Sequence, residues 1–383
     1  MKLRLFLLVA AISAGLVSAG RVETSRRPRY GGTLRVEIGA VIHSLDPAGA
    51  TSDAEESAAK EELGALLYDQ RNPDGSFAGV AGSGAFHIAQ WESGKRLTLA
   101  ANENCRGGRP FVDAIEIEMG RAAKDRLLDL EVGSADFAEI PPQEARRATE
   151  RGVRVSASRP EELVALVFAA GHSIGEDARA REALSRSIDR AAIVNFILQK
   201  EGEPAGGLLP QWLNGTAFLF PTATDAAGAK EMWSQIPGLP RIALGYDSGG
   251  SLGQAIAERI AVNARDAGIA LSAEAVPTAA SAANYDVRLV RLRMKSARPR
   301  DALSGIVATL APGTGLDATP LPAAASSEQI YGRERDIVSS YRVVPVVWLP
   351  RTYGLGSRVR DWKAPAAGEG WPLADIWLEQ DSR

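Results

Sequence analysis

The chain has 383 residues, which is enough for two or three domains of ordinary size. Hydrophobic residues make up 45% of it and charged residues 24%, and the formal net charge is -3. This balance excludes a global bias toward nucleic acid or other highly charged partners, so any charge preference must be local.

The first twenty residues have the pattern of an export signal. Two basic residues precede an apolar run from Leu5 to Val17, and Val17-Ser18-Ala19 has the small residues that signal peptidase accepts. The run is shorter than the roughly 20 residues that a membrane span needs. We therefore expect residues 1–19 to be a cleaved signal peptide and the mature protein to be periplasmic or secreted, with an uncleaved anchor as the alternative.

The cysteine and histidine content argues against disulfides and metal sites. Cys105 is the only cysteine, so an intrachain disulfide, a metal-thiolate cluster and lipidation at the cleavage site are all excluded. His43, His87 and His172 are scattered and lack the H-E-x-x-H spacing of a zinc site. We expect neither a metal nor a bound cofactor.

The first half of the chain predicts an α/β lobe. Alternating apolar residues mark the first strand, and four glycines with a proline in thirteen residues allow only turn structure in the loop. In chain order, the expected elements are a strand over 33–38, a helix over 53–68, a loop over 72–84, a meander of strands over 85–91, 95–101 and 114–119, and a helix over 122–131.

The second half predicts a further α/β lobe, because strands again alternate with helices. A segment over 308–327, rich in Ala, Pro, Gly and Thr, is expected to be an irregular loop or inter-lobe linker. In chain order, the other expected elements are a strand over 163–169, a helix over 178–200, a strand over 241–246, a helix over 252–267, and strands over 269–276, 285–294 and 342–349.

Residues 249–253 read GGSLG, which fits the G-x-S-x-G nucleophile elbow of α/β-hydrolases. The serine of such an elbow needs a histidine that follows it in the chain, but the last histidine is His172. We interpret the stretch as a strand turning into a helix, with Asp247 and Ser248 capping the helix and Gly249-Gly250 forming the turn. We expect no catalytic residues, and a hydrolase stays a distant alternative.

Four longer stretches form a recognisable pattern. They are YGGTLRVEIGAVIHSLDPA (30–48), GSGAFHIAQWESGKRLTLAANENCRGGRPFVDAIEIEM (82–119), REALSRSIDRAAIVNFIL with GEPAGGLLP (within 181–210), and VVPVVWLPRTYGLGSRVRDW (343–362). In this order they resemble the family 5 extracellular solute-binding proteins, the peptide, dipeptide and nickel receptors of ABC importers. The second stretch is the most specific, since it is similar to that family's G-T-G-P-Y opening, W-x-x-G turn and G-G-x-P-x-x-D end.

The resemblance implies a two-lobed, periplasmic-binding-protein-like α/β architecture with mixed sheets and a reduced first lobe. We expect lobe I over residues 20–165, lobe II over 166–341 and a return to lobe I over 342–383. The implied function is to bind a peptide-like or small anionic solute between the lobes for the membrane permease of an ABC importer, without catalysis or nucleic acid, as a monomer. The alternative is a degenerate relative that acts as a scaffold or sensory partner outside transport.

The chain departs from the family pattern in its first lobe. Members usually carry an extra subdomain between the first helix and the G-T-G-P-Y opening, including a stretch similar to F-x-L-R-x-G-V-K-F-H-D-G. Here Tyr68 reaches Gly82 through a single glycine-rich loop. A short flexible loop closes at a small entropic cost, so we expect the shortened lobe to fold.

A second departure concerns the family's W-x-x-D-Y-x-x-P motif, whose Asp is implied to pair with a peptide's α-ammonium. Aligned from Tyr285-Asp286-Val287, this chain has Leu292, Lys295 and Pro299 in place of the Trp, Asp and final Pro. A buried or half-buried lysine would repel an ammonium by several kcal/mol. Ordinary recognition of a peptide N-terminus is therefore expected to fail.

The candidate ligand-binding residues follow from these comparisons. A period of two puts Arg291, Arg293 and Lys295 on one strand face, which would suit an anion if it lines the cleft. The alternative is an edge strand with a solvated basic face. The further candidates, for which packing is the alternative role, are Trp212, Trp348, Arg351 and Tyr353.

Overall fold

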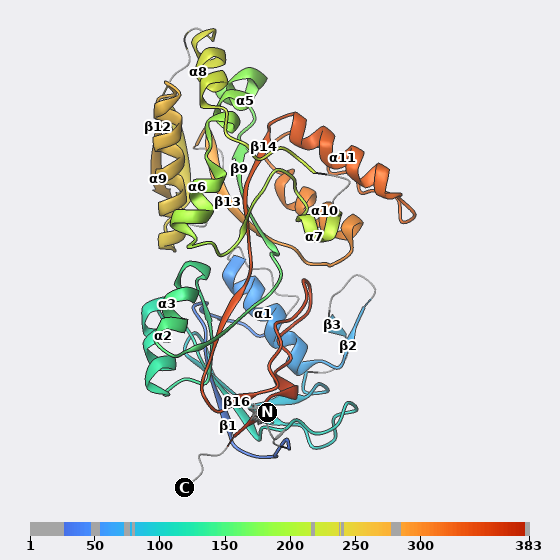
Figure 1. Ribbon diagram of the computed structural model, residues 1–383. Helices are drawn as coiled ribbons and strands as arrows, with labels where there is room; N and C mark the ends of the chain where they lie inside the picture. Colours follow the sequence, from blue (N-terminus) through green and yellow to red (C-terminus); the bar gives the residue numbers. More distant parts are fainter. Residues whose placement is uncertain are drawn as a thin grey trace, which may run out of the picture.

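The chain forms two α/β lobes, stacked one above the other in Figure 1. The computed structural model describes residues 27–46, 54–72, 77–78, 81–215, 219–236, 238, 241–276 and 285–379. The expected signal peptide lies outside these ranges. Among the helices within them, none has the length and apolarity to cross a membrane.

Lobe I is built on a seven-stranded sheet in the order β4-β5-β6-β1-β7-β15-β8. Its central strand β1 pairs in parallel with β6 and β7, and the outer pairs are antiparallel. The strands are β1 (Thr33–Glu37), β4 (Phe86–Glu92), β5 (Arg96–Ala101), β6 (Ala114–Glu118), β7 (Phe137–Ile140), β8 (Arg154–Ala157) and β15 (Thr352–Leu355).

Helices cover both faces of this sheet. Successive side chains of a strand point to opposite faces, so Phe137 and Ala138 of β7 enter different cores. Phe137 packs in the core shared with α1 (Ala54–Leu67), and Ala138 packs in the core shared with α2 (Ala123–Val132) and α3 (Ala145–Glu150). The remaining small elements of lobe I are β2 (Gln70–Arg71), β3 (Phe77–Ala78), η1 (Pro142–Glu144), β16 (Val359–Arg360), η4 (Leu373–Asp375) and β17 (Trp377–Leu378).

The short connection after α1 is fastened directly to the end of that helix. Gly82 and Gly84 both donate their N–H groups to the Leu67 carbonyl, at 2.7 and 3.0 Å. Asn102 Nδ2 donates to the carbonyls of the same two glycines. A Cβ at Gly84 would lie 2.5 Å from the Leu66 carbonyl, so only glycine fits there. The loop expected over 72–84 also contains the two-residue strand β3, which pairs with β2.

This fastening predicts that the shortened lobe unfolds together with the rest of the chain. We expect a single cooperative thermal transition, followed by circular dichroism. Removing the amide in Asn102→Ala should lower the free energy of unfolding by about 1–2 kcal/mol, because two backbone carbonyls lose their donor. A broad transition without a baseline, or no effect of the substitution, would show that the junction is not structured as described.

Lobe II is built on a six-stranded mixed sheet in the order β10-β14-β9-β13-β11-β12. One face packs against α5, α8 and α9, and the other against α10 and α11. The strands are β9 (Glu162–Phe168), β10 (Glu203–Pro204), β11 (Ile242–Asp247), β12 (Leu271–Val276), β13 (Val287–Arg293) and β14 (Val343–Leu349). The helices are α4 (Ser173–Glu176), α5 (Ala178–Ser187), α6 (Arg190–Ala192), the π-helix η2 (Ile193–Ile197), α7 (Gln211–Asn214), α8 (Ala226–Ser234), α9 (Ser251–Asp266), α10 (Pro299–Leu310) and α11 (Ser327–Ser339).

The helix expected over 178–200 is interrupted. α5 ends at Ser187, and Ile188 takes an extended conformation with ψ 120°. Asp189 then starts a new helix, because its carboxylate accepts from the Ala192 N–H at 2.8 Å. The break lets the Ile188 side chain enter the core and turns Arg190 inward.

The segment expected over 308–327 as a loop or inter-lobe linker lies within lobe II. Its first residues belong to α10, and the rest joins α10 to α11, with Leu316 and Leu321 packed against the lobe II core. It is therefore a connection inside one lobe and does not link the two.

The edge-strand alternative for the basic strand is also wrong. β13 pairs with β9 over its whole length and with β11 over residues 287–289, so it is an interior strand whose last residues extend beyond β11. Its basic face needs a different explanation, which the contacts of Arg291 and Arg293 supply below.

Candidate functional site

Two segments run between the lobes, one from β8 to β9 and the other from β14 to β15 (Figure 1). The chain passes from one sheet to the other at residues 158–161 and 350–351, whereas the expected lobe boundaries were at 165 and 342. The two segments are joined, since Ser158 N donates to the Arg351 carbonyl and Glu161 N to the Leu349 carbonyl, both at 2.9 Å. Arg351 N donates in turn to Ser158 Oγ at 3.0 Å. They form one hydrogen-bonded ribbon with Arg351 in it.

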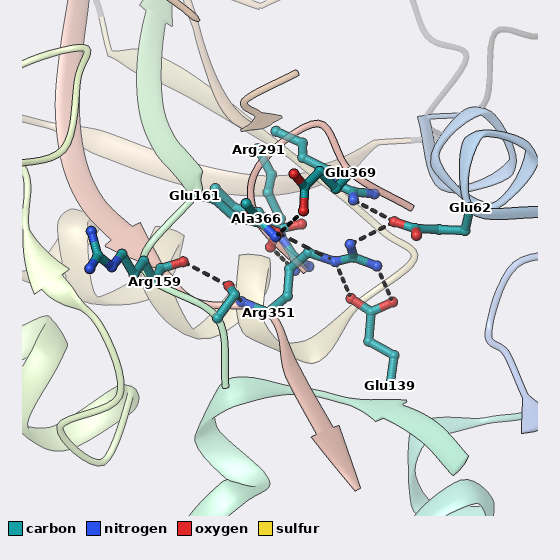
Figure 2. A network of polar contacts seen from close by, with 11 residues as sticks. Glu62, Glu139, Arg159, Glu161, Arg291, Arg351, Ala366 and Glu369 are labelled. Carbon is teal, nitrogen blue, oxygen red and sulfur yellow. Dashed lines mark hydrogen bonds and ion pairs between the residues drawn. The ribbon is translucent and has the colours of Figure 1, made fainter. Parts of the chain in front are cut away.

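A set of buried and half-buried charged side chains gathers around this ribbon. We call Glu62, Glu139, Glu161, Arg293 and Arg351 the Arg351 cluster. Figure 2 shows the Arg351 guanidinium lying between Glu62 of α1 and Glu139 of β7. Nη1 of Arg351 donates to Glu62 at 2.6 Å, while its Nε and Nη2 donate to the two oxygens of Glu139 at 3.1 and 3.3 Å. Glu161 lies 3.8 Å from the same guanidinium.

The Arg351 cluster joins the lobes electrostatically. Arg293, at the end of β13 in lobe II, donates to the Glu62 carboxylate of lobe I. The side chains of Arg351 and Glu62 are only 2% and 1% exposed. Pairing of this kind is what allows charges to remain buried, because an unpaired charge in that environment is strongly unfavourable.

The cluster shifts the pKa values of its carboxyl groups in opposite directions. Burial raises the pKa of Glu161 to about 7, against the smaller lowering effects of Arg293 and Arg351. Burial also acts to raise the pKa of Glu139, but the charge of Arg351 and its hydrogen bonds outweigh it and lower that pKa to about 2. Glu161 can therefore change its charge near neutral pH while Glu139 stays ionised.

Several buried polar atoms near the ribbon have hydrogen-bonding capacity to spare. Within the described residues, Glu62 Oε2, Glu161 Oε1, Trp348 Nε1 and the Tyr353 hydroxyl are buried without a hydrogen-bond partner. A buried polar group left unpaired costs about 1–3 kcal/mol. The region can accordingly accept hydrogen bonds through its carboxylates and donate them through the indole and phenol.

The three predicted basic residues on β13 and just after it are not equivalent. Arg293 belongs to the Arg351 cluster, and Arg291 donates to Glu162, with its side chain 48% exposed. Lys295 is exposed, and its backbone lies against Gly368, where a Cβ would come within 2.2 Å of the Lys295 carbonyl. The expectation of a buried or half-buried lysine is wrong, so a large desolvated repulsion does not arise there.

The predicted aromatic residues mostly serve packing. Trp348 is 1% exposed in the lobe II core, and Tyr353 is fully buried in the lobe I core against Phe137 and Trp362. Trp212 lies beside the ribbon, where its Nε1 donates to the Pro160 carbonyl at 2.7 Å. The Arg159 guanidinium lies 5.3 Å from the centre of the Trp212 ring. Of the three rings, Trp212 alone keeps partial exposure.

Sequence reasoning missed the carboxylates. Glu62 occurs in the helical stretch AEESAAKEELGALL, where the apolar residues Ala58 and Leu66, one turn before and after it, give a weak signal of a buried partner. Glu161 and Glu162 stand directly before an apolar strand, and Glu139 stands within one. No local pattern pairs any of them with Arg351, since the partners come from distant parts of the chain.

The C-terminal part of lobe I also reaches across to lobe II. Ala367 is 7% exposed and packs in a lobe II core, although the strands on either side of it belong to lobe I. Beside it opens a cavity of about 330 Å³, lined by α1, the β2–β3 hairpin and Gly368–Gly370. Its mouth holds two carboxylates, Asp69 and Glu369, near the stacked rings of Tyr68 and Phe77.

The G-x-S-x-G stretch forms the expected strand, turn and helix. The capping differs from the expectation, because Gly250 is the N-cap of α9 and lacks a side-chain cap bond. Asp247 instead accepts from the Gly249 N–H at 2.9 Å, which holds the turn. Ser251 is the exposed first residue of the helix.

Comparison with known families gives a match over most of the chain. The family described as bacterial extracellular solute-binding proteins, family 5 (middle), matches residues 50–309. The probable D,D-dipeptide-binding periplasmic protein DdpA of Escherichia coli K12 is 26% identical over 164 residues, which are 42% of this chain and 32% of DdpA. The oligopeptide-binding protein AppA of Bacillus subtilis is 26% identical over 125 residues, which are 32% of this chain and 23% of AppA. The matched stretches thus span a third or less of these relatives.

Solved structures extend the likeness to the whole fold. The periplasmic binding protein DppA from Helicobacter pylori, in complex with the peptide STSA, has a TM-score of 0.73 at 14% identity, covering 92% of this chain and 99% of that one. NikA from Staphylococcus aureus, in complex with Ni(L-His)2, has a TM-score of 0.64 at 16% identity, covering 78% and 69%. The predicted two-lobed, periplasmic-binding-protein-like α/β fold is confirmed.

Proposed function

The chain belongs to the family 5 bacterial extracellular solute-binding proteins, and on that basis we propose that it binds a solute between its lobes outside the cytoplasm and delivers it to the permease of an ABC importer. The observation that carries the proposal is the Arg351 cluster, which brings charged groups of both lobes and the connecting ribbon together. Lobe closure over a ligand is a general way for such a receptor to signal occupancy.

The charges around the cluster favour a zwitterionic, peptide-like solute over a simple anion. Three arginines (Arg291, Arg293 and Arg351) face four carboxylates (Glu62, Glu139, Glu161 and Glu162), so these described groups offer no excess positive charge. The more accessible groups are divided between the lobes. Glu139 in lobe I is 32% exposed, whereas Arg291 and Lys295 on lobe II are more open.

This division gives the solute a direction. Its ammonium group would lie toward Glu139, and its carboxylate toward Arg291 and Lys295, so that one molecule bridges both lobes. Trp212, beside the ribbon, supplies the accessible aromatic surface.

A binding screen tests the proposal. We expect free dipeptides and tripeptides to raise the melting temperature in a thermal-shift assay. At a peptide concentration of 100 times the dissociation constant, binding adds about 2.7 kcal/mol to the free energy of unfolding. Analogues blocked at the amino or carboxyl end should bind about tenfold more weakly, and so should Glu139→Gln and Arg291→Gln. Arg96→Gln, at an exposed ion pair on β5, is the matched control and should bind normally.

The other results of this screen are also decisive. If dicarboxylates bind more tightly than peptides, the proposal of a zwitterionic solute is wrong and the expectation of a small anionic solute is supported. No binding across peptides, carboxylates and nickel complexes would favour the scaffold or sensory relative. That alternative draws support from the inter-lobe pair between Arg293 and Glu62, which holds the lobes together through the chain's own groups.

A further inference from the structure

A separate cavity lies inside lobe II, at the opposite end of β14 from Arg351. It has a volume of about 270 Å³ and is bordered by α5, the start of α6 and the segment that leads into β14. Much of its wall is apolar, formed by Val338, Val343, Val344 and Pro345. The cavity is therefore suited to a small ligand with an apolar portion.

The polar part of this wall is dominated by Arg190, which is only 5% exposed. Nε of Arg190 donates to the carbonyls of Ala205 and Pro345, at 3.1 and 2.9 Å. Nη1 donates to the Ser185 carbonyl at 3.2 Å, and Nη2 to the Ser185 hydroxyl at 3.3 Å. A guanidinium has five N–H groups, and these contacts use three of them.

Arg190 has no anionic partner among the described residues. Every acceptor that it reaches in the described structure is a neutral carbonyl or hydroxyl oxygen. Arg351, by contrast, is equally buried but lies among three carboxylates. Burial without a counter-charge lowers the pKa of Arg190 to about 10. Buried cations are ordinarily paired with an anion. The described part of the chain supplies none to Arg190, so its positive charge is available to an anionic ligand.

The carboxylate that borders the cavity does not fill this role. Asp225 lies at the rim, where its Oδ2 accepts from Arg186 Nη1 at 3.0 Å. Arg186 also donates to Glu182 at 2.6 Å, so its charge is taken up by two carboxylates. The positive charge available to a ligand is therefore that of Arg190.

We propose that this cavity is a second binding site, which takes a small organic carboxylate with a short apolar tail. The carboxylate would accept from the spare N–H groups of Arg190 and from the Ser185 hydroxyl, because the planar guanidinium matches a carboxylate in a two-pronged geometry. The tail would pack on the valine and proline wall. This site is independent of the solute site between the lobes, and it is too small for an extended peptide.

The test uses sodium propionate and sodium butyrate as probes, with isothermal titration of the whole chain at constant ionic strength. We expect saturable 1:1 binding, tighter for butyrate than for propionate because its tail buries more apolar surface. Ala223→Phe, at an exposed position of the rim, should block the cavity and weaken butyrate binding by at least about tenfold. Ala227→Phe, at an exposed position of α8 outside the lining, is the matched control and should change it less than about twofold.

The outcomes separate this site from the inter-lobe site. Arg190→Lys keeps the charge but loses the planar fork, so it should also weaken butyrate binding, and if it fails to fold the Ala223→Phe variant decides. Butyrate binding that survives Ala223→Phe, or is lost instead in Glu139→Gln, would overturn the assignment. Inorganic phosphate or chloride competing as well as butyrate would overturn the organic carboxylate, and no binding of either probe would overturn the site.

Discussion

Replacing Arg351 with methionine is expected to lower the free energy of unfolding by about 3–5 kcal/mol, measured by urea denaturation at pH 7. The reason is that methionine fills much of the same space but removes the cation that Glu62, Glu139 and Glu161 share. Arg293 still reaches Glu62, so the loss is concentrated on Glu139 and Glu161.

The matched control is Arg96→Met in lobe I. Arg96 pairs with Glu118 on the surface, with side chains 56% and 43% exposed, and such pairs contribute about 0–1 kcal/mol. Adding Glu139→Gln to Arg351→Met should recover part of the stability, since Glu139 is the ionised carboxylate that loses both of its hydrogen bonds to Arg351. A loss for Arg351→Met no greater than for the control would mean that the cluster is solvated rather than buried.

The second large effect is a loss of stability as the pH rises from 5.5 to 8. Glu334 of α11 is fully buried and accepts from Leu209 N and Asn214 Nδ2, both at 2.8 Å, with no cation among its described contacts. Burial raises its pKa to about 7 from 4.5. The folded chain therefore holds this proton more tightly than the unfolded chain between these values, and stability falls through that window by about 2 kcal/mol for this group.

Urea denaturation at several pH values measures this dependence. Glu334→Gln keeps an oxygen acceptor and carries no charge, so it should reduce the loss between pH 5.5 and 8 by about 2 kcal/mol. The exposed Glu116→Gln on β6 should leave the pH dependence as it is. Some dependence will remain in Glu334→Gln, because burial also raises the pKa values of Glu37 and Glu161 to about 7. If the free energy of unfolding of Glu334→Gln depends on pH in the same way as that of the unchanged chain, burial does not raise the pKa of Glu334.

Much of the fold follows from local sequence patterns. The first-lobe strands β1, β4, β5 and β6 and the β11–α9–β12 unit lie within two residues of their expected bounds, because alternating and helical apolar periods report directly which side chains face a core. The short strands β7, β8 and β15 of the same sheet were not predicted. The helix over 178–200 failed at Ile188, where burial of one side chain and a cap at Asp189 outweigh the continuous helical pattern. Such tertiary preferences leave no periodic signal.

Sequence reasoning found the basic residues of the candidate site but not their carboxylate partners. Arg291 and Arg293 stand out as charges within a strand pattern, Arg351 was a candidate through the family resemblance, and Arg293 and Arg351 lie in the Arg351 cluster. Their partners Glu62 and Glu139 lie far away in the chain, and whether a cation is free or neutralised depends on which helix crosses the sheet end. The period of two fixed the face of β13, but only the sheet order fixed what lies opposite that face.

The ribbon between the lobes also constrains how they can move. Because its two strands are hydrogen-bonded to each other, we expect them to bend together, so that any relative movement of the lobes is mainly a rotation about an axis across the ribbon. Ala367 and Gly368 contact lobe II at a distance from that axis. A small rotation at the ribbon would give a larger displacement there, so we expect a side chain at Gly368, whose Cβ would lie 2.2 Å from the Lys295 carbonyl, to change how the lobes fit together.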